Sequence, residues 1–414
     1  MHVTQGSGTA ERVARVIFEH AARISKEKEI SVLAEQNADL ARDLTGAERC
    51  SLWLLEQTGE LCTRVAHGVK EIRIPRGQGI VGACVEQNHP IIINDAQSDP
   101  RFFSGVDSHS GYQTQAIACV PLTSNGAVIG AVQLLNKPGG FTAEDAELLQ
   151  LMAVYAAAAI QGERLRQEAE AARLFRRELE VAAEVQRRLL PSIETGWNGI
   201  EVAALCRPAR CVGGDFYDLI ELSGGNFAVT LGDVSGKGFP AAVMMASIHT
   251  LLRSLLLHSH NDLSWVVEEL NEAIQRSSTA ERYSTLLCGL LDASRTQFKY
   301  VNAGHIPPFV VRSAGEIERP DGAGLPAGLL PGISYLQSQV SLSPGDLIVC
   351  LSDGLTEAQD ANGELWEADA IEKILQESRG DPVEEILRKL VRAADSHAGS
   401  AEQADDMTVL VVRV

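Results

Sequence analysis

Long apolar runs are scarce in this chain of 414 residues, and none is expected to span a membrane. The first residues also lack the basic and apolar sections of a secretory signal peptide. These absences predict a cytoplasmic protein. The length predicts two or three domains, and the hydrophobic share of 45% is enough for a buried core in each.

Cysteine motifs and an excess of positive charge are lacking as well. The eight cysteines show no metal-type spacing, and the Cys-x5-Arg phosphate loop of cysteine phosphatases is absent. Because Cys119, Cys288 and Cys350 lie within apolar runs, we expect reduced core cysteines rather than disulfides. The formal net charge of −19 argues against nucleic acid as a partner.

The first 160 residues carry helical patterns at both ends and strand patterns between them. Apolar residues recur with helical spacing from Ala10 to Leu44, and a second helix is predicted from Thr142 through Ile160. Asn125-Gly126 predicts a hairpin turn. Strands are expected at about 50–55, 61–65, 90–93, 116–122 and 128–135. This order predicts an α+β sensor domain over residues 10–161.

Several short motifs in this segment resemble those of GAF domains. They are Ile72-Arg73-Ile74-Pro75, Asp99-Pro100-Arg101-Phe102, Gly105-Val106-Asp107, Gly111-Tyr112-Gln113-Thr114, and Asn136-Lys137 with Phe141 and Asp145. The likeness is greatest to the cyclic-nucleotide-binding GAF domains of phosphodiesterases and cyanobacterial adenylyl cyclases, although Ala146 stands at the position of the closing glutamate. The resemblance implies a sensor for a small molecule, with cAMP or cGMP as the candidates.

The same resemblance places ligand contacts at eight positions. Hydroxyl groups and N–H groups at a helix start can hold a cyclic phosphate, and an aromatic ring can stack on a purine. The alternative is that Ser110 and Thr114 cap a helix and Phe103 is core. Because Ala66-His67 replaces the family's aromatic–aspartate pair, the choice between cAMP and cGMP stays open, as does another ligand or none. The positions are Ser51, Ile80, Val81, Phe103, Asp107, Ser110, Thr114 and Gln133.

A charged helical stretch over residues 162–190 follows, and Pro191 ends it. Its apolar residues form a short heptad seam that Glu168 and Gln186 interrupt. The favoured interpretation is a parallel coiled coil in a homodimer, and the alternative is a single helix packed on its own domain. The seam consists of Leu165, Ala172, Phe175, Leu179, Ala182 and Leu189.

Aspartates beside glycines border several apolar runs in the second half of the chain. Asp233 follows one such run, Asp353 follows another, and Asp405-Asp406 precedes the last one. A carboxylate at a strand end, beside glycine, suits a hard divalent cation, and oxygen-only ligands favour Mn²⁺ or Mg²⁺ over zinc. Each motif taken alone is also ordinary turn chemistry.

In this order the motifs resemble those of the metal-dependent protein phosphatase 2C (PP2C) family, especially its bacterial sporulation and stress-response branch. They are GGDFYD from Gly213, GDVSGKG from Gly232, SDGLTE from Ser352 and DDMTV from Asp405, with the turn Asn302-Ala303-Gly304-His305. The resemblance implies an α/β/β/α sandwich over residues 198–414. It also implies two metal ions that activate a water for attack on phosphoserine or phosphothreonine. The implied metal ligands are the catalytic residues Asp215, Asp233, Asp353 and Asp405, with the carbonyl of Val234.

Three roles and the overall function stay open at this point. Asp218 is either an acceptor behind the ligands or part of a turn, His305 is a minor candidate for a general acid, and Lys237 either meets the substrate phosphate or is a surface residue. The branch implies an anti-sigma-factor antagonist as the protein substrate. The alternative is a non-catalytic scaffold that binds a regulatory partner. A cyclic-nucleotide phosphodiesterase is disfavoured, because its paired His and Asp motifs are missing.

Overall fold

The computed structural model describes residues 15, 29–66, 71–105, 107, 111–193, 199–277, 282–320, 322, 324–366 and 368–414. Most of the helix expected from Ala10, together with Ser110 and His67, lies outside these residues. The chain divides into two units, Met1–Leu174 and Phe175–Val414.

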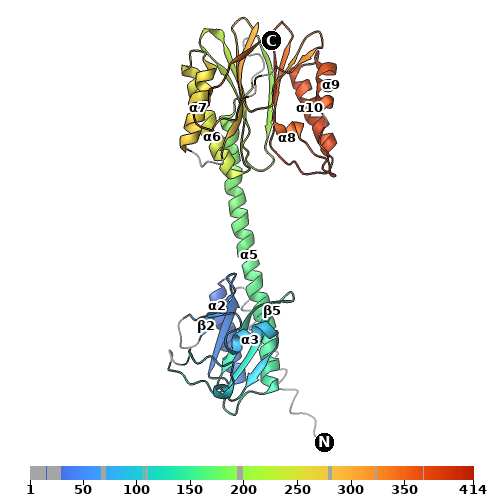
Figure 1. The fold of residues 1–414 in the computed structure, drawn as a ribbon. Helices are drawn as coiled ribbons and strands as arrows, with labels where there is room; N and C mark the ends of the chain where they lie inside the picture. Colours follow the sequence, from blue (N-terminus) through green and yellow to red (C-terminus); the bar gives the residue numbers. More distant parts are fainter. Residues whose placement is uncertain are drawn as a thin grey trace. The chain divides into compact units, whose positions relative to one another are not determined.

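The N-terminal unit is built around one six-stranded antiparallel sheet with the order β3-β2-β1-β6-β5-β4 (Figure 1). Asn125 and Gly126, both with positive φ, form the predicted turn between β5 and β6. The elements are α2 (Ile30–Thr45), β1 (Arg49–Leu55), β2 (Glu60–Ala66), β3 (Arg73–Pro75), α3 (Gly79–Gln87), β4 (Ile91–Ile93), η1 (Ala96–Ser98), β5 (Ile117–Ser124) and β6 (Ala127–Leu135).

Side-chain alternation along β1 gives the sheet two different faces. Cys50, Leu52 and Leu54 pack with α2 and the start of α5 in one core. Trp53 faces the other side, where α3 covers a second core. The strand pattern therefore assigns Arg49, Ser51 and Trp53 to the face that α3 covers.

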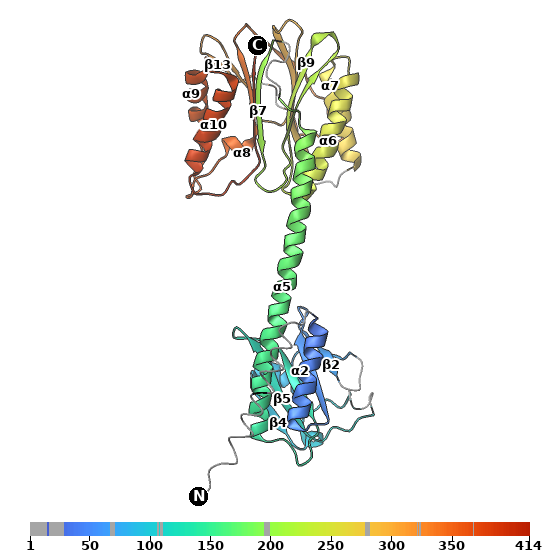
Figure 2. The same ribbon diagram turned by 180° about the vertical axis from the view of Figure 1, so that it is seen from behind.

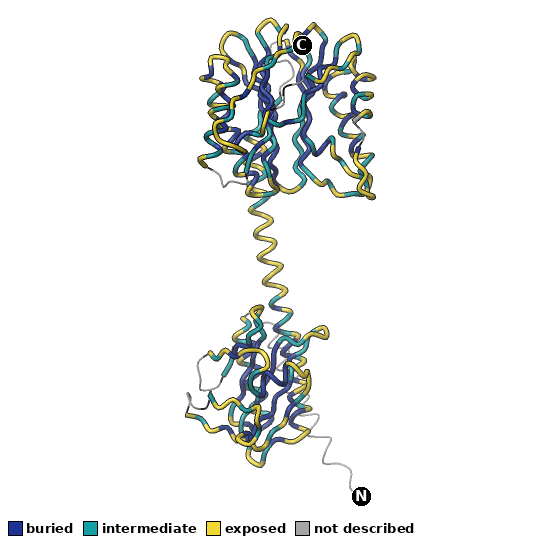
Figure 3. Tube along the Cα trace, viewed as in Figure 1, coloured by how far each residue is buried: buried dark blue, intermediate teal, exposed yellow. Residues whose placement is uncertain are grey.

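Helix α5 (Ala143–Leu189) is continuous over 47 residues, so no break separates the expected sensor helix from the expected linker. Its first turns bury residues such as Leu149 and Met152 in the N-terminal unit. All residues from 165 to 178 are exposed (Figure 3). The helix ends two residues before Pro191, as the sequence predicted.

The C-terminal unit consists of two five-stranded antiparallel sheets, ordered β14-β11-β10-β9-β8 and β13-β12-β15-β16-β7. Helices α6 and α7 cover one outer face and α9 and α10 the other (Figures 1 and 2), as expected for the α/β/β/α sandwich. The strands are β7 (Glu201–Arg207), β8 (Phe216–Glu221), β9 (Phe227–Val234), β10 (Ser284–Leu291), β11 (Gln297–Ala303), β12 (Phe309–Val311), β13 (Ile317–Glu318), β14 (Ser338–Ser341), β15 (Leu347–Leu351) and β16 (Met407–Arg413). The helices are η2 (Ser223–Gly225), α6 (Phe239–His258), α7 (Leu263–Ser277), α8 (Asp353–Thr356), α9 (Ala368–Ser378) and α10 (Val383–Ala398).

Alternation along the strands builds three cores in this unit. Leu410 and Val412 of β16 point between the sheets, whereas Val409 and Val411 point toward α9 and α10. Helix α6 has 20 residues and a mean hydropathy of 1.4, so by length and composition alone it could cross a membrane, contrary to the sequence expectation. Its residues Met245, Ile248 and Leu252 pack in the core beneath α6 and α7, which makes it a core helix. All eight cysteines are free, and Cys119, Cys288 and Cys350 are buried, as predicted for core residues, whereas Cys211 is exposed.

Candidate metal centre and ligand pocket

Paired strands bring the four predicted aspartates to one end of the sandwich. Asp215 precedes β8, and Asp233 lies near the end of the neighbouring strand β9, where Phe216 pairs with Gly232. Asp353 opens α8 directly after β15, and Asp405 precedes β16, which pairs with β15. Each sheet thus contributes two carboxylates, which lie far apart in the sequence.

The protonation behaviour of these carboxylates shows that they interact. Burial and the nearby Asp233 raise the pKa of Asp215 well above its usual value. Burial, followed by the charges of Asp353, Asp405 and Asp406, raises the pKa of Asp233 to about 7. Burial and Asp405 also raise the pKa of Asp353. Buried like charges of this kind disfavour full ionisation unless a cation is present between them.

The two carboxylate oxygens of Asp215 have different surroundings, as is common for a metal ligand. Its Oδ2 accepts a 2.6 Å hydrogen bond from the Thr408 hydroxyl. Its Oδ1 is buried and has no hydrogen-bond partner among the described residues. A buried carboxylate oxygen without a donor is costly, and a bound cation would compensate it.

Glycine is required beside this carboxylate. A Cβ on Gly214 would lie 2.7 Å from the carbonyl oxygen of Val234 and 3.4 Å from Asp233 Oδ1. The absence of a side chain therefore lets the Val234 carbonyl and Asp233 approach the segment that carries Asp215.

The adjacent Asp405 and Asp406 have different surroundings. Asp406 is buried and accepts hydrogen bonds from the backbone N–H groups of Ala209, at 2.8 Å, and Gly214, at 2.6 Å. Asp405 Oδ2 lies 2.8 Å from the Lys237 ammonium group, which also donates to the Ala404 carbonyl. Asp406 therefore holds the loop that leads to Asp215, whereas the Asp405 side chain, with 39% of its surface exposed, is the more accessible of the two.

The residue types fit Mn²⁺ or Mg²⁺, because the set offers only oxygen atoms and includes the unpartnered Oδ1 of Asp215. Within the described part of the chain, no three His, Cys, Asp or Glu side chains are grouped closely enough to hold one ion as they stand. In this arrangement Asp405 is paired with Lys237, at 2.8 Å.

Asp218 and His305 have contacts that support structural roles. Asp218 is buried in β8 and binds Arg253 Nη1 through both oxygens, at 2.7 and 2.8 Å. His305 Nδ1 lies 2.8 Å from the Thr285 hydroxyl, and Asn302 closes the turn by bonding both the N–H and the carbonyl of His305. Burial lowers the pKa of His305 to about 4, so its ring is neutral near pH 7.

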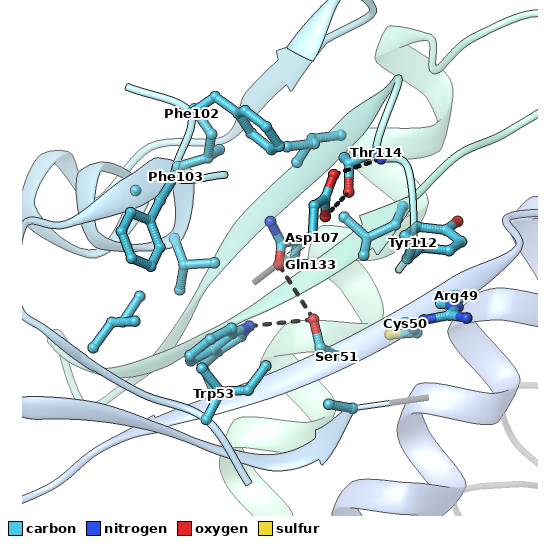
Figure 4. A pocket seen from close by; sticks show the side chains of 18 residues that line it. Arg49, Cys50, Ser51, Trp53, Phe102, Phe103, Asp107, Tyr112, Thr114 and Gln133 are labelled. Atoms are coloured by element: carbon cyan, nitrogen blue, oxygen red, sulfur yellow. Dashed lines mark hydrogen bonds between the residues drawn. The ribbon is translucent and has the colours of Figure 1, made fainter. Parts of the chain in front are cut away.

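A cavity in the N-terminal unit contains seven of the eight predicted ligand positions (Figure 4), and Ser110 lies outside the described residues. The space within it that water-sized molecules can occupy is about 80 Å³. The seven residues are Ser51, Ile80, Val81, Phe103, Asp107, Thr114 and Gln133.

Two hydrogen-bonded clusters of polar side chains line this cavity (Figure 4). The Ser51 hydroxyl lies 3.2 Å from Gln133 Oε1 and accepts a hydrogen bond from Trp53 Nε1. Asp107 accepts hydrogen bonds from the backbone N–H and the hydroxyl of Thr114, both at 2.8 Å. Thr114 thus orients Asp107 rather than capping a helix.

Other residues of the cavity were missed by the motif comparison. Phe103 has 40% of its surface exposed, so the alternative that it belongs to the core is wrong. The Arg49 guanidinium lies 3.8 Å from the centre of the Tyr112 ring, whose hydroxyl donates to Glu48. Period-two spacing from Ser51 could have predicted Arg49 and Trp53. Lining residues that were not expected to contact a ligand include Arg49 and Trp53, which lie outside the motifs, and Phe102 and Tyr112, which lie within them.

The GAF signature residues are structural. Lys137 Nζ lies 2.7 Å from both carboxylate oxygens of Asp145, and Asp145 also accepts from the backbone N–H of Thr142. These contacts fasten the hairpin end to the first turn of α5.

Two family models match the chain. The GAF domain model matches residues 29–160, and the model described as Stage II sporulation protein E (SpoIIE) matches residues 223–414. The SiaA-PP2C domain of Pseudomonas aeruginosa has a similar fold, with a TM-score of 0.53 and 22% sequence identity, over 59% of this chain and 99% of that domain. Fold and comparisons together define a GAF-linked protein of the PP2C phosphatase class.

Among curated relatives, the phosphoserine phosphatase RsbU of Bacillus subtilis is 30% identical over 241 residues, which cover 57% of this chain and 70% of RsbU. The protein IcfG of a Synechocystis strain is 26% identical over 263 residues, 57% of this chain and 41% of IcfG. The chain belongs to the family of PP2C-type serine phosphatases that includes RsbU.

Proposed function

We propose that this chain is a cytoplasmic, metal-dependent protein serine/threonine phosphatase that a small ligand regulates through the GAF domain. The observation that carries the proposal is the acidic centre, where a buried oxygen of Asp215 has no partner among the described residues and faces further carboxylates. The proposed domains are a GAF domain over 10–161, a helical linker over 162–190 and a phosphatase domain over 198–414.

The residues of the acidic centre have two proposed roles, namely metal binding and the positioning of the metal ligands. Asp215, Asp233, Asp353, Asp405 and the carbonyl of Val234 would hold two Mn²⁺ or Mg²⁺ ions. When bound, such ions activate water and neutralise phosphate oxygens. Thr408 orients the Asp215 carboxylate, and Asp406 holds the backbone before it.

The proposed substrate is a phosphorylated anti-sigma-factor antagonist. Its support is the likeness to RsbU, whose name specifies a phosphoserine phosphatase. The alternative function is a non-catalytic scaffold that binds a regulatory partner, and the full set of four aspartates disfavours it.

The proposed GAF ligand is cAMP or cGMP. The exposed ring of Phe103 at the cavity offers a stacking surface for a purine, and the Arg49 guanidinium offers positive charge for a phosphate. Gln133 supplies an amide for the polar edge of the base.

Hydrolysis of p-nitrophenyl phosphate and of a phosphoserine peptide tests the function. The assays contain Mn²⁺, Mg²⁺ or EDTA, each with and without cAMP or cGMP. We expect turnover that EDTA abolishes, and a nucleotide effect on it. Binding of a phosphorylated partner without turnover under any metal would instead establish the scaffold function.

We further propose that the chain forms a parallel homodimer through α5. Exposed residues with heptad spacing occur along α5 up to Phe175. The later seam residues Leu179, Ala182 and Leu189 are already half-buried by contacts within the single chain. A second copy would therefore pack along the first part of the helix. The exposed heptad residues are Leu151, Val154, Ala158, Leu165, Ala172 and Phe175.

Replacing both Leu165 and Phe175 by glutamate should convert the dimer to a monomer, because two pairs of like charges would face each other across the seam. Light scattering coupled to size-exclusion chromatography measures the mass. Arg177→Glu, on an exposed residue on the side of the helix opposite the seam, is the matched control and should stay dimeric. An unchanged mass in the double variant would locate the dimer contact elsewhere.

A further inference from the structure

One polar residue in the last turns of α5 is buried although its neighbours are exposed. Gln186 has 9% of its surface exposed, whereas Val185 on the same turn has 57%. Its amide Nε2 donates a 2.7 Å hydrogen bond to the Gly213 carbonyl, and its Oε1 accepts a 3.2 Å bond from the Gly213 N–H. This explains why a glutamine interrupts the apolar seam of the helix.

Gly213 lies two residues before Asp215, in a segment that is held from two sides. A Cβ on Gly213 would lie 2.2 Å from Asp406 Oδ2, and the next N–H, that of Gly214, donates to the same oxygen. Gln186 therefore holds Gly213 from the helix, while Asp406 occupies the opposite side. Both sets of contacts fix the path of the backbone into Asp215.

We propose that Gln186 is a positioning residue that sets the Asp215 segment for metal binding, so that metal affinity depends on the placement of the last turns of α5. This inference rests on the proposed metal-dependent phosphatase function. The glutamine amide supplies both the donor and the acceptor that the two backbone groups of Gly213 need. Successive helix residues are about 100° apart around the axis, so a rotation by one residue would break both bonds.

The test is Gln186→Leu in the full chain, with Mn²⁺ binding measured by titration calorimetry and by electron paramagnetic resonance. We expect the apparent Kd for Mn²⁺ to rise on the order of tenfold, as for other residues that orient metal ligands. Phosphatase activity at limiting Mn²⁺ should fall by a similar factor and recover at saturating Mn²⁺. A role in folding alone would not be rescued by metal in this way.

Gln186→Glu is the second variant, because it keeps the shape and the acceptor but loses the donor to the Gly213 carbonyl. Arg188→Ala, on an exposed residue two positions along the helix, is the matched control and should bind Mn²⁺ as the unaltered chain does. Unchanged Mn²⁺ affinity in both Gln186 variants would overturn the inference, as would loss of folded structure in both by circular dichroism. Absence of Mn²⁺ binding and turnover in the unaltered chain would overturn the proposed function instead.

Discussion

Replacing Asp233 by asparagine should lower metal-dependent hydrolysis on the order of 10²-fold or more. Asp233 interacts with Asp215 in its own sheet and with Asp353 and Asp405 from the other sheet, so it is central to the acidic centre. Changes behind a metal ligand already cost about 10–100-fold, and loss of the ligand itself should cost at least as much. The rate with a phosphoserine peptide over a range of Mn²⁺ concentrations measures the effect.

The same substitution should raise the stability of the metal-free protein at pH 8. Because burial and neighbouring carboxylates raise the pKa of Asp233 from 3.8 to about 7, its ionisation lowers stability progressively between these pH values, and the full loss is present at pH 8. Asparagine removes the charge, so the melting temperature in EDTA should increase. Asp369→Asn, on the exposed start of α9, is the control and should change neither quantity appreciably. Full activity of Asp233→Asn at limiting metal would remove this residue from the ligand set.

Replacing Gly354 by alanine should damage both stability and activity. Its Cβ would lie 2.0 Å from the Asp406 carbonyl oxygen and 3.0 Å from the Asp405 carbonyl carbon. Because these atoms belong to the backbone, α8 and the segment before β16 must move apart, and Asp353 and Asp405 would move with them. Overpacking of this kind lowers the free energy of unfolding by about 1–3 kcal/mol. We expect activity to fall on the order of 10²-fold, as when a residue that orients a metal ligand is lost.

Gly380→Ala is the matched control, because a Cβ there meets no atom within 4 Å and its φ is not positive. Thermal unfolding and Mn²⁺-dependent hydrolysis should both be close to those of the unaltered chain. If Gly354→Ala behaved like Gly380→Ala, the close approach of α8 to the Asp405-Asp406 segment would not be important for the centre.

Both substitutions act on contacts between residues that are far apart in the sequence. Helices α6 and α7 and several strands lie between Asp233 and Asp353 in the chain. Gly354 lies against a backbone segment about fifty residues further along the sequence. The acidic centre is therefore a property of the assembled sandwich, and small changes in the placement of either sheet would alter it.

Many residues that line the cavity of the N-terminal unit could be predicted from motifs. The residues carried over from the GAF resemblance meet at one cavity, apart from Ser110, because each belongs to a strand, helix start or loop whose local sequence identifies it. Arg49 and Trp53 lie outside the motifs, and Phe102 and Tyr112 lie within them but were not expected to contact a ligand, because motifs do not specify which side chains face the same space. That depends on strand register, such as the pairing of Ser51 with Gln133.

The sequence by itself determined the elements and the chemistry of the candidate sites. Apolar periodicity located the helices and strands, and aspartates beside strand ends identified an oxygen-lined centre. The tertiary structure alone decided that Asp406 holds the backbone while Asp405 pairs with Lys237, that Asp218 binds Arg253, and that Gln186 binds Gly213. The physical reason is that periodicity records which face of an element is buried, whereas a hydrogen-bond partner 27 to 192 residues away is set by the register and packing of the assembled domain.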